Sequence, residues 1–168
     1  PYRWRKVAPL TLAANTLAEN EPMRNGIDRE WNGEDNGVYT APGEVNLTYT
    51  WAKPVTVSDV RFIFDSDLKV RSKRMRKLEA TTERKEMPSE MVKAFKVQVR
   101  VPAATRKQSK LNAADPAAGE WVTVAEVKDN FRRLVKLSFD AVQTDAVRIV
   151  VDETWGAEKA HIFAFDVK

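Results

Sequence analysis

Residues 95–101 read FKVQVRV, a run in which apolar and polar side chains alternate. Such alternation is typical of a half-buried antiparallel strand, because successive side chains point to opposite faces. Four further runs rich in Val, Ile, Thr and Phe follow before residue 168: Trp121–Val127, Leu134–Phe139, Ala146–Val151 and Ala160–Val167. Short polar turns separate these four runs. Several strands at such close spacing predict an all-β fold, an antiparallel β-sandwich of the jelly-roll kind.

The first half of the chain has fewer strands and longer connections. Residues 1–24 form an N-terminal extension with one expected short strand near Leu10–Ala14. Asn-Gly and Pro-Gly dipeptides fill residues 25–46 and predict a long loop. Two strands follow, split by Lys53-Pro54: Asn46–Trp51 and Val55–Asp65. We therefore assign residues 25–168 to a single β-sandwich domain.

A basic segment interrupts this pattern between residues 69 and 86, where Lys and Arg dominate. We interpret it as an exposed insertion with a short helix around Arg74–Thr82. Its charges are suited to phosphate groups, and nucleic-acid binding with a steep salt dependence is one hypothesis. However, aromatic residues are not interleaved with the charges, as single-strand binders usually require. The pattern favours a solvated insertion, and nucleic acid is not the expected partner.

The composition excludes several classes of function. The chain has 168 residues, of which 43% are hydrophobic and 31% charged, and its net charge is +4. It contains no Cys, which excludes disulfides, thiolate catalysis and Cys-based metal sites. No apolar run approaches the roughly 20 residues that span a bilayer. The sequence opens at Pro1 rather than Met, so we expect a processed or excised piece.

Few residues offer catalytic chemistry. His161 is the only histidine, and no Ser lies in a nucleophile-elbow context. Two carboxylate pairs could act as an acid and a base if correctly spaced, but each lies at a strand end, where Asp is also an ordinary turn residue: Asp65 with Asp67, and Asp152 with Glu153. We therefore expect no enzymatic activity from this chain alone.

Aromatic residues in loops are better candidates for a binding role. Trp155 lies in the turn Asp152–Gly156, directly after a strand. An exposed indole there could stack on the apolar face of a sugar ring, or the ring could pack under a neighbouring loop. Trp31 and Tyr39 lie in the long first loop, where packing is the favoured interpretation.

Several short motifs resemble those of a known family: Asn25–Arg29, Leu47–Trp51, Pro54–Val57, Val60–Asp65, Gly119–Trp121, Asn130–Arg133, Val147–Val151 and Thr154–Gly156. In this order they resemble a discoidin-type domain, the coagulation factor V/VIII C-domain family, with its galactose-binding-like jelly roll. The similarity extends over about residues 20–168. The run Phe64–Leu68, the variable insertion, and Met87-Pro88 ahead of Val92–Phe95 resemble a narrower group, the C-terminal domain of bacterial FAD-dependent oxidoreductase-like proteins of exported, glycan-degrading type.

The resemblance implies a ligand site on three loops at one end of the sandwich: Asn25–Glu44, Asp65–Met87 and Asp152–His161. The residues expected to bind the ligand are Trp155, His161, Trp31, Asn32, Asp35 and Asn36. Many relatives also hold a structural calcium through a Glu in the final strand, and Ala164 stands at that position here. We therefore expect no metal or cofactor, with calcium as an open alternative, and the flavin site would lie outside this chain.

Two hypotheses follow. The first is a non-catalytic carbohydrate-binding accessory module of a larger exported bacterial enzyme, with an extracellular or periplasmic location implied by the resemblance. The alternative is a structural or docking domain of a multidomain FAD-dependent oxidoreductase-like protein, with no ligand of its own. The expected partner is a glycan in the first case and other domains of the parent polypeptide in the second.

Overall fold

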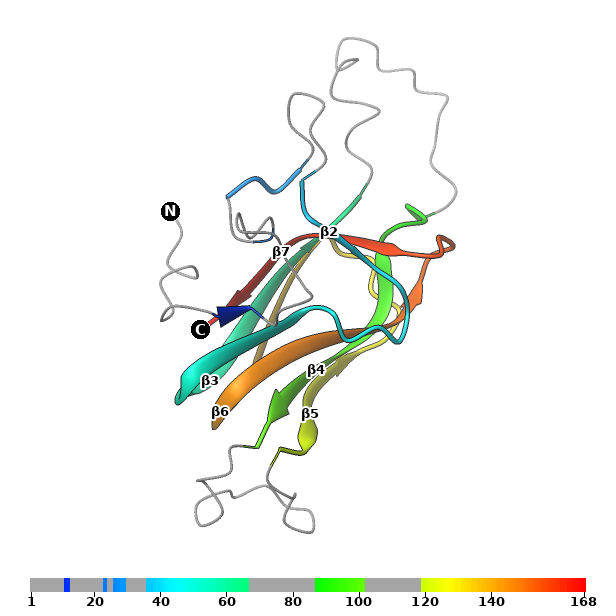
Figure 1. Ribbon diagram of the computed structural model, residues 1–168. Helices are drawn as coiled ribbons and strands as arrows, with labels where there is room; N and C mark the ends of the chain where they lie inside the picture. Colours follow the sequence, from blue (N-terminus) through cyan, green and yellow to red (C-terminus); the bar gives the residue numbers. More distant parts are fainter. Residues whose placement is uncertain (1–10, 13–22, 24–25, 30–35, 67–86, 102–118) are drawn as a thin grey trace, which may run out of the picture.

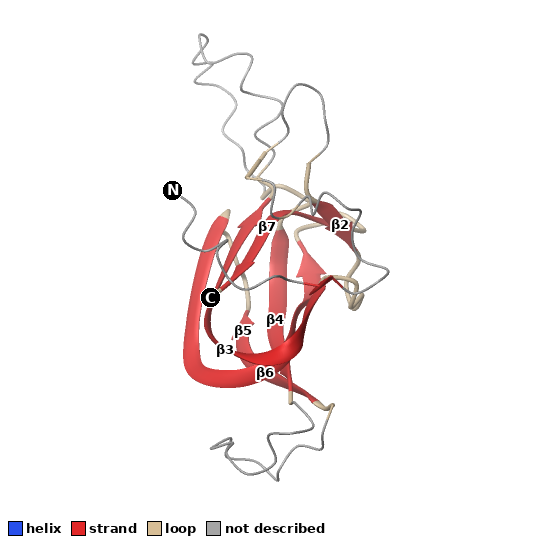
Figure 2. Ribbon diagram, turned by 60° about the vertical axis from the view of Figure 1, so that its left-hand side comes forward, coloured by secondary structure: helices blue, strands red, loops and turns tan. Residues whose placement is uncertain are grey.

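The computed structural model describes residues 11–12, 23, 26–29, 36–66, 87–101 and 119–168. Every regular element in these ranges is a strand (Figure 2). In chain order the strands are β1 (Thr11–Leu12), β2 (Val38–Thr40), β3 (Thr48–Phe64), β4 (Val92–Arg100), β5 (Trp121–Val127), β6 (Leu134–Thr154) and β7 (Ala160–Val167). The expected all-β fold is thereby confirmed. Within the described residues no helix has the length and apolar character needed to cross a membrane.

All strand pairs are antiparallel and belong to one sheet with the order β2-β7-β3-β6-β4-β5, with β1 paired to β3 beside this path. β3 and β6 are long and strongly curved (Figures 1 and 2), so the sheet bends over its own inner face. Phe62 on β3 and Phe95 on β4 show the effect. β6 lies between their strands, which would separate them by about 10 Å in a flat sheet. Their ring centroids are nevertheless 5.2 Å apart, in edge-to-face contact.

The core fills this bend with aromatic and branched side chains. Phe62 stacks on Phe165 at 4.8 Å, and Phe64 meets Phe95 at 5.3 Å. Tyr49 is fully buried beside them and donates its hydroxyl hydrogen to the carbonyl of Phe165 at 2.9 Å. The apolar residues whose alternation predicted the strands are therefore also the residues whose side chains face the core.

Two predicted breaks are wrong. The runs expected on either side of Pro54 form the single strand β3, and the runs expected on either side of residues 140–145 form the single strand β6. Pro54 is exposed and lies in a gap in the β3–β6 pairing between Thr50 and Val55, where its missing N–H breaks no ladder bond. Gln143 and Thr144 pair with Thr56 and Val55, so the polar stretch of β6 continues the sheet.

β2 was missed, because a three-residue strand between Gly37 and Pro42 reads as loop in the sequence. β1 falls inside the expected Leu10–Ala14 segment. The basic insertion at residues 69–86, with its expected helix, lies wholly outside the described residues, which stop at Ser66 and resume at Met87.

β7 is the most enclosed strand, since all eight of its residues are buried. Its neighbours are β2 and β3, and its inner face joins the main core. The opposite face carries Phe163 and Ala164, which form a second small apolar cluster with Ile63. Asp166 on this face pairs with Arg61, whose Nε lies 2.8 Å from the Asp166 carboxylate. The polar residues of the candidate site lie on this same outer face, near the start of β7.

Candidate functional site

Loops far apart in the sequence meet where β7 begins and β3 ends. His161 is the hub: its carbonyl accepts the N–H of Asp65 at 3.0 Å, and its own N–H donates to the carbonyl of Glu90 at 3.0 Å. Nearby, the N–H of Ala157 donates to the carbonyl of Ser89 at 3.0 Å. The Asn36 carbonyl also contacts His161, at 2.7 Å, so all three loops implied by the resemblance contribute described residues to one end of the sheet (Figure 1).

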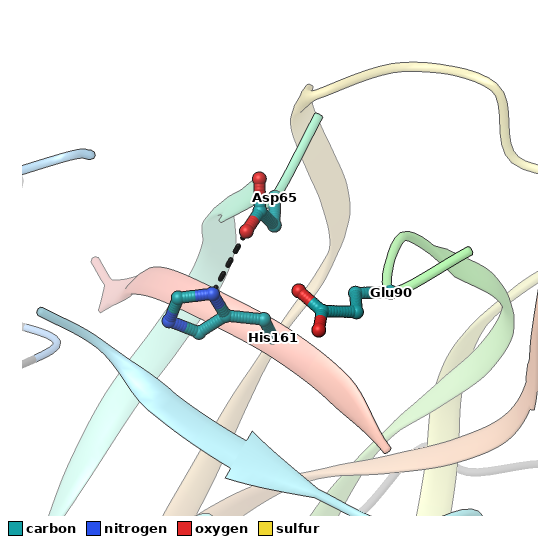
Figure 3. Close-up of side chains that lie close together, drawn as sticks. All are labelled: Asp65, Glu90 and His161. Atoms are coloured by element: carbon teal, nitrogen blue, oxygen red, sulfur yellow. Dashed lines mark hydrogen bonds and ion pairs between the residues drawn. The ribbon is translucent and has the colours of Figure 1, made fainter. Parts of the chain in front are cut away.

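The imidazole of His161 is fully buried and bonded at both nitrogens. Nε2 lies 2.7 Å from the carbonyl oxygen of Asn36, and Nδ1 lies 2.8 Å from Oδ2 of Asp65. Figure 3 shows the ring aimed at the Asp65 carboxylate. A carbonyl only accepts, so Nε2 carries a hydrogen. The contact between Nδ1 and Asp65 then needs one further proton, held either by the imidazole as an ion pair or by the carboxyl group.

Aromatic packing fixes the plane of this ring. Tyr39 of β2 stacks on His161 with centroids 4.1 Å apart, and Phe163 contacts it at 4.3 Å. Gly37 passes so close that an added Cβ would lie 3.0 Å from Nε2 and 2.5 Å from the carbonyl oxygen of Ile162. Its φ of +91° also suits only glycine. The main chain of the turn before β2 therefore packs directly against the imidazole and leaves no room for a side chain at residue 37.

Arg133 lies on the same face, with its guanidinium 5.6 Å from the centre of the Phe163 ring. It donates a hydrogen bond to the carbonyl of Asp28. Burial lowers the pKa of this guanidinium, and the negative charges of Asp65 and Asp28 act in the opposite direction. Arg133 therefore brings a positive charge to the carboxylate that contacts His161.

Glu90 completes a cluster of three potential metal ligands. The nearest ligand atoms of Asp65, Glu90 and His161 all lie within 4.8 Å of one another. Ala164, the position at which the resemblance implied a calcium-binding Glu, is fully buried against Ile63 and offers no side-chain oxygen. The residues able to hold a cation are therefore different from those that the resemblance implied.

Trp155 is half-buried and packs against the main core. Its indole N–H donates to the carbonyl of Asn130 at 2.7 Å, and Nζ of Lys93 lies 5.5 Å from the ring centre. Lys93 is also paired with Glu153 at 2.7 Å, a contact that raises the pKa of the lysine. The ring thus packs as one of the two interpretations expects and keeps a partly exposed surface.

The remaining predicted ligand residues divide into two groups. Asn36 is buried, and its carbonyl holds His161. Trp31, Asn32 and Asp35 lie outside the described residues. The imidazole itself lies beneath the surface, so its direct contact with a sugar stays a prediction that needs the ring to become accessible.

A fourth loop, Lys128–Arg133, joins this end of the molecule and was not expected to do so. Phe131 at its tip is 65% exposed, and the guanidinium of Arg132 lies 5.4 Å from its ring centre. The loop is held from beneath by Asn130, which is 5% exposed. Its amide nitrogen donates to the carbonyls of Val92 and Arg132, at 2.9 and 3.1 Å, and its side-chain oxygen accepts the Arg132 N–H at 3.0 Å.

Phe131 is thus presented to solvent by a fixed turn. Sequence reasoning missed it because the stretch Asp129–Arg133 reads as a polar turn between two strands. One signal was present: Asn130–Arg133 was among the motifs that carried the family resemblance.

The carboxylate pair considered for catalysis on β6 is engaged in ion pairs. Asp152 lies 3.1 Å from Nζ of Lys96, and Glu153 pairs with Lys93. Asp67, the partner considered for Asp65, lies outside the described residues.

No family model matches the sequence, and no curated protein matches it. Solved structures do share the fold. The family 32 carbohydrate-binding module of Streptococcus pneumoniae EndoD has a TM-score of 0.52 and 16% identity, with 96% of this chain and 90% of that one covered. Chitosan-binding module 1 of a chitosanase/glucanase from Paenibacillus sp. IK-5 has a TM-score of 0.51 and 15% identity, with 98% and 95% covered.

A third structure, the family 32 module of AlyQ in complex with 4,5-unsaturated mannuronic acid, has a TM-score of 0.52 and 11% identity, with 96% of this chain and 94% of that one covered. At such identities the likeness concerns the fold, and in each case it extends over nearly the whole of both chains. The chain therefore has the galactose-binding-like β-sandwich fold of these carbohydrate-binding modules.

Proposed function

We propose that this chain is a non-catalytic carbohydrate-binding module whose ligand lies on the loop end, beside Phe131 and Trp155. The observation that carries the proposal is the presentation of Phe131. A ring exposed to 65% sits on a loop that the buried Asn130 holds in one conformation. A single exposed apolar side chain is ordinary on a protein surface. Here it is fixed in place on a fold shared with sugar-binding modules.

The neighbouring groups suit a sugar. Trp155 donates its N–H to the backbone of Asn130, so the second aromatic ring lies next to the loop that carries Phe131. Arg132 and Lys93 bring hydrogen-bond donors to the two rings. Binding sites of this kind combine an apolar surface with a few placed polar groups, and those polar groups set the specificity.

The wider setting belongs to the same proposal. We place the module in a larger exported bacterial enzyme, in an extracellular or periplasmic location, as an accessory domain resembling the C-terminal domain of FAD-dependent oxidoreductase-like proteins. In that arrangement the flavin and the chemistry belong to another part of the polypeptide. The glycan-binding surface would then hold the enzyme near its substrate.

The test is a titration with neutral, amino and uronic oligosaccharides, followed by isothermal calorimetry and tryptophan fluorescence. We expect saturable binding by the wild type to at least one class of sugar and a loss of about tenfold or more in Phe131→Ala and in Trp155→Ala. Trp121→Ala is the matched control, because this half-buried aromatic pairs with Arg100 at the opposite end of β4. We expect the control to bind like the wild type.

Absence of binding to every sugar class by a folded wild-type protein would overturn the proposal. Co-purification of the separately expressed parent domains with this chain would then support the docking-domain alternative. Equal losses of affinity in the Trp121 control and the two loop variants would show that the effect comes from general destabilisation.

A further inference from the structure

The cluster of Asp65, Glu90 and His161 lies at the same end of the molecule but is a separate feature. It is buried beneath the loop surface, apart from Glu90, which is half-buried and opens it toward solvent. The three residues come from three segments: the end of β3, the turn before β4 and the start of β7. Figure 3 shows the two carboxylates approaching the imidazole from different sides.

The backbone fixes these residues relative to one another. The main chain of His161 bonds to Asp65 through its carbonyl and to Glu90 through its N–H, each at 3.0 Å. The three side chains therefore project from adjacent, hydrogen-bonded positions. A ligand set held in this way needs little ordering when a cation binds, which favours affinity.

The imidazole is oriented as a metal ligand would be. Metal-binding histidines nearly always donate their second ring N–H to a carbonyl or carboxylate, which fixes the tautomer and directs the other nitrogen at the metal. Here the Asn36 carbonyl accepts from Nε2 at 2.7 Å, and Nδ1 faces the carboxylates. The stacked ring of Tyr39 adds a second constraint on the ring plane.

The Asp65 carboxylate faces Nδ1 directly. Its Oδ2 lies 2.8 Å from Nδ1, while Nε2 on the other side of the ring contacts the Asn36 carbonyl at 2.7 Å. Glu90 adds a second carboxylate to the same space, and none of its side-chain atoms makes a hydrogen bond or ion pair in the described structure. Arg133 offsets part of this negative charge through Asp65, so the cation must also gain from direct coordination.

We propose that Asp65, Glu90 and His161 form a site for a divalent transition-metal ion of the zinc class, bound by the imidazole Nδ1 and the two carboxylates. One imidazole nitrogen with two carboxylate oxygens is a ligand set for Zn²⁺ and its neighbours. Calcium prefers six to eight oxygen ligands and is not served by an imidazole. The three ligand atoms now lie within 4.8 Å of one another, so side-chain movements at all three residues would be needed to place each about 2.0–2.2 Å from a shared ion. Water completes the coordination.

The single histidine makes the test direct. Tag-free protein, stripped with a chelator, is titrated with Zn²⁺ while the imidazole ¹⁵N signals are followed by NMR. We expect one equivalent of Zn²⁺ to shift the Nδ1 signal and leave Nε2 protonated. Co²⁺ should give a visible absorption band at the same stoichiometry, and Ca²⁺ should change neither signal.

Variants separate coordination from folding. Glu90→Gln removes a ligand that has no hydrogen bond to lose, so the metal-free variant should unfold at the wild-type temperature while its Zn²⁺ affinity falls about tenfold or more. Glu158→Gln makes the same change at an exposed position in the nearby loop and should bind Zn²⁺ like the wild type. An unchanged Nδ1 signal at excess Zn²⁺, or equal Zn²⁺ affinity in Glu90→Gln and wild type, would overturn the proposal. The sugar titration does not depend on this outcome, so the two proposals fail separately.

Discussion

Replacing Asn130 by Ala tests whether the loop that presents Phe131 is held by a single buried amide. The substitution removes three hydrogen bonds: two donated to the carbonyls of Val92 and Arg132, and one accepted from the Arg132 N–H. Arg132 is exposed, so water can replace its two bonds. Val92 is fully buried, and its carbonyl loses a partner that water does not easily replace.

The expected cost follows from this difference. An orphaned buried carbonyl costs about 1–3 kcal/mol, and the two water-compensated bonds add about 0.5 kcal/mol each. We therefore expect the free energy of unfolding to fall by about 2–4 kcal/mol. For a chain of this size each kcal/mol lowers the melting temperature by about 2–4 °C, so Tm should fall by about 4–16 °C.

The assay is chemical denaturation followed by tryptophan fluorescence, with calorimetry for Tm. Trp155 serves as a local reporter, because its N–H bonds to the main chain of Asn130. Gln143→Ala is the control: this residue is exposed on β6, and its truncation should change stability by less than about 0.5 kcal/mol. An Asn130→Ala variant as stable as this control would refute the reasoning. Phe131→Ala should keep wild-type stability and lose sugar binding, which distinguishes the support from the surface it presents.

Three other substitutions probe different parts of the structure. Gly37→Ala should lower the free energy of unfolding by about 2–4 kcal/mol in a denaturant titration. The residue has a φ of +91°, and the new Cβ would lie 2.5 Å from the carbonyl oxygen of Ile162. An unchanged free energy of unfolding would contradict this and mean that the turn moves easily. Tyr49→Phe should cost about 1–3 kcal/mol in the same assay, since it orphans a buried main-chain carbonyl of β7, and a change below about 0.5 kcal/mol would contradict the bond. Hydrogen bonds from the hydroxyl of Ser58 and, to a smaller extent, of Ser138 lower the pKa of Asp59. The contribution of Asp59 to stability is therefore complete above about pH 4 and is lost as pH falls through the lowered folded-state pKa. Asp59→Asn should reduce the acid-side slope of stability against pH, and an unchanged slope would refute the assignment.

Sequence patterns were most reliable where a short apolar-rich run follows clear turn residues, as Gly119-Glu120 precede β5 and Gly156–Lys159 precede β7. The bounds of β5 and β7 agree with the sequence expectation at every residue. The sequence patterns failed where a strand bends. Pro54 and the largely polar stretch 140–145 resemble turns, yet each lies within a continuous strand. A curved strand exposes polar residues at its bend, so its local composition is that of a loop.

The site was less predictable than the fold for a physical reason. Asp65 and His161 are 96 positions apart, and only the pairing of β3 with β7 brings them into contact. The ligand role expected of His161 came from the resemblance, whereas its buried bonds to Asp65 and Asn36 depend on register. Glu90 gave no signal, because a Glu beside a Pro-Ser turn is ordinary. A site formed by residues from distant segments has no characteristic local spacing from which the sequence could predict it.

The enclosed position of β7 also governs how this domain is made. β3 can complete its pairing only when β7 is available, and the ion pair between these strands joins residues 105 positions apart. During synthesis one hydrogen-bonding edge of β3 therefore stays unpaired until β7 has left the ribosome. Contacts of such long sequence separation form slowly, and an exposed strand edge is prone to association with other chains. Nascent chains of this protein should therefore depend on chaperones until residue 167 emerges, and premature termination within β7 should yield aggregates rather than a smaller folded domain.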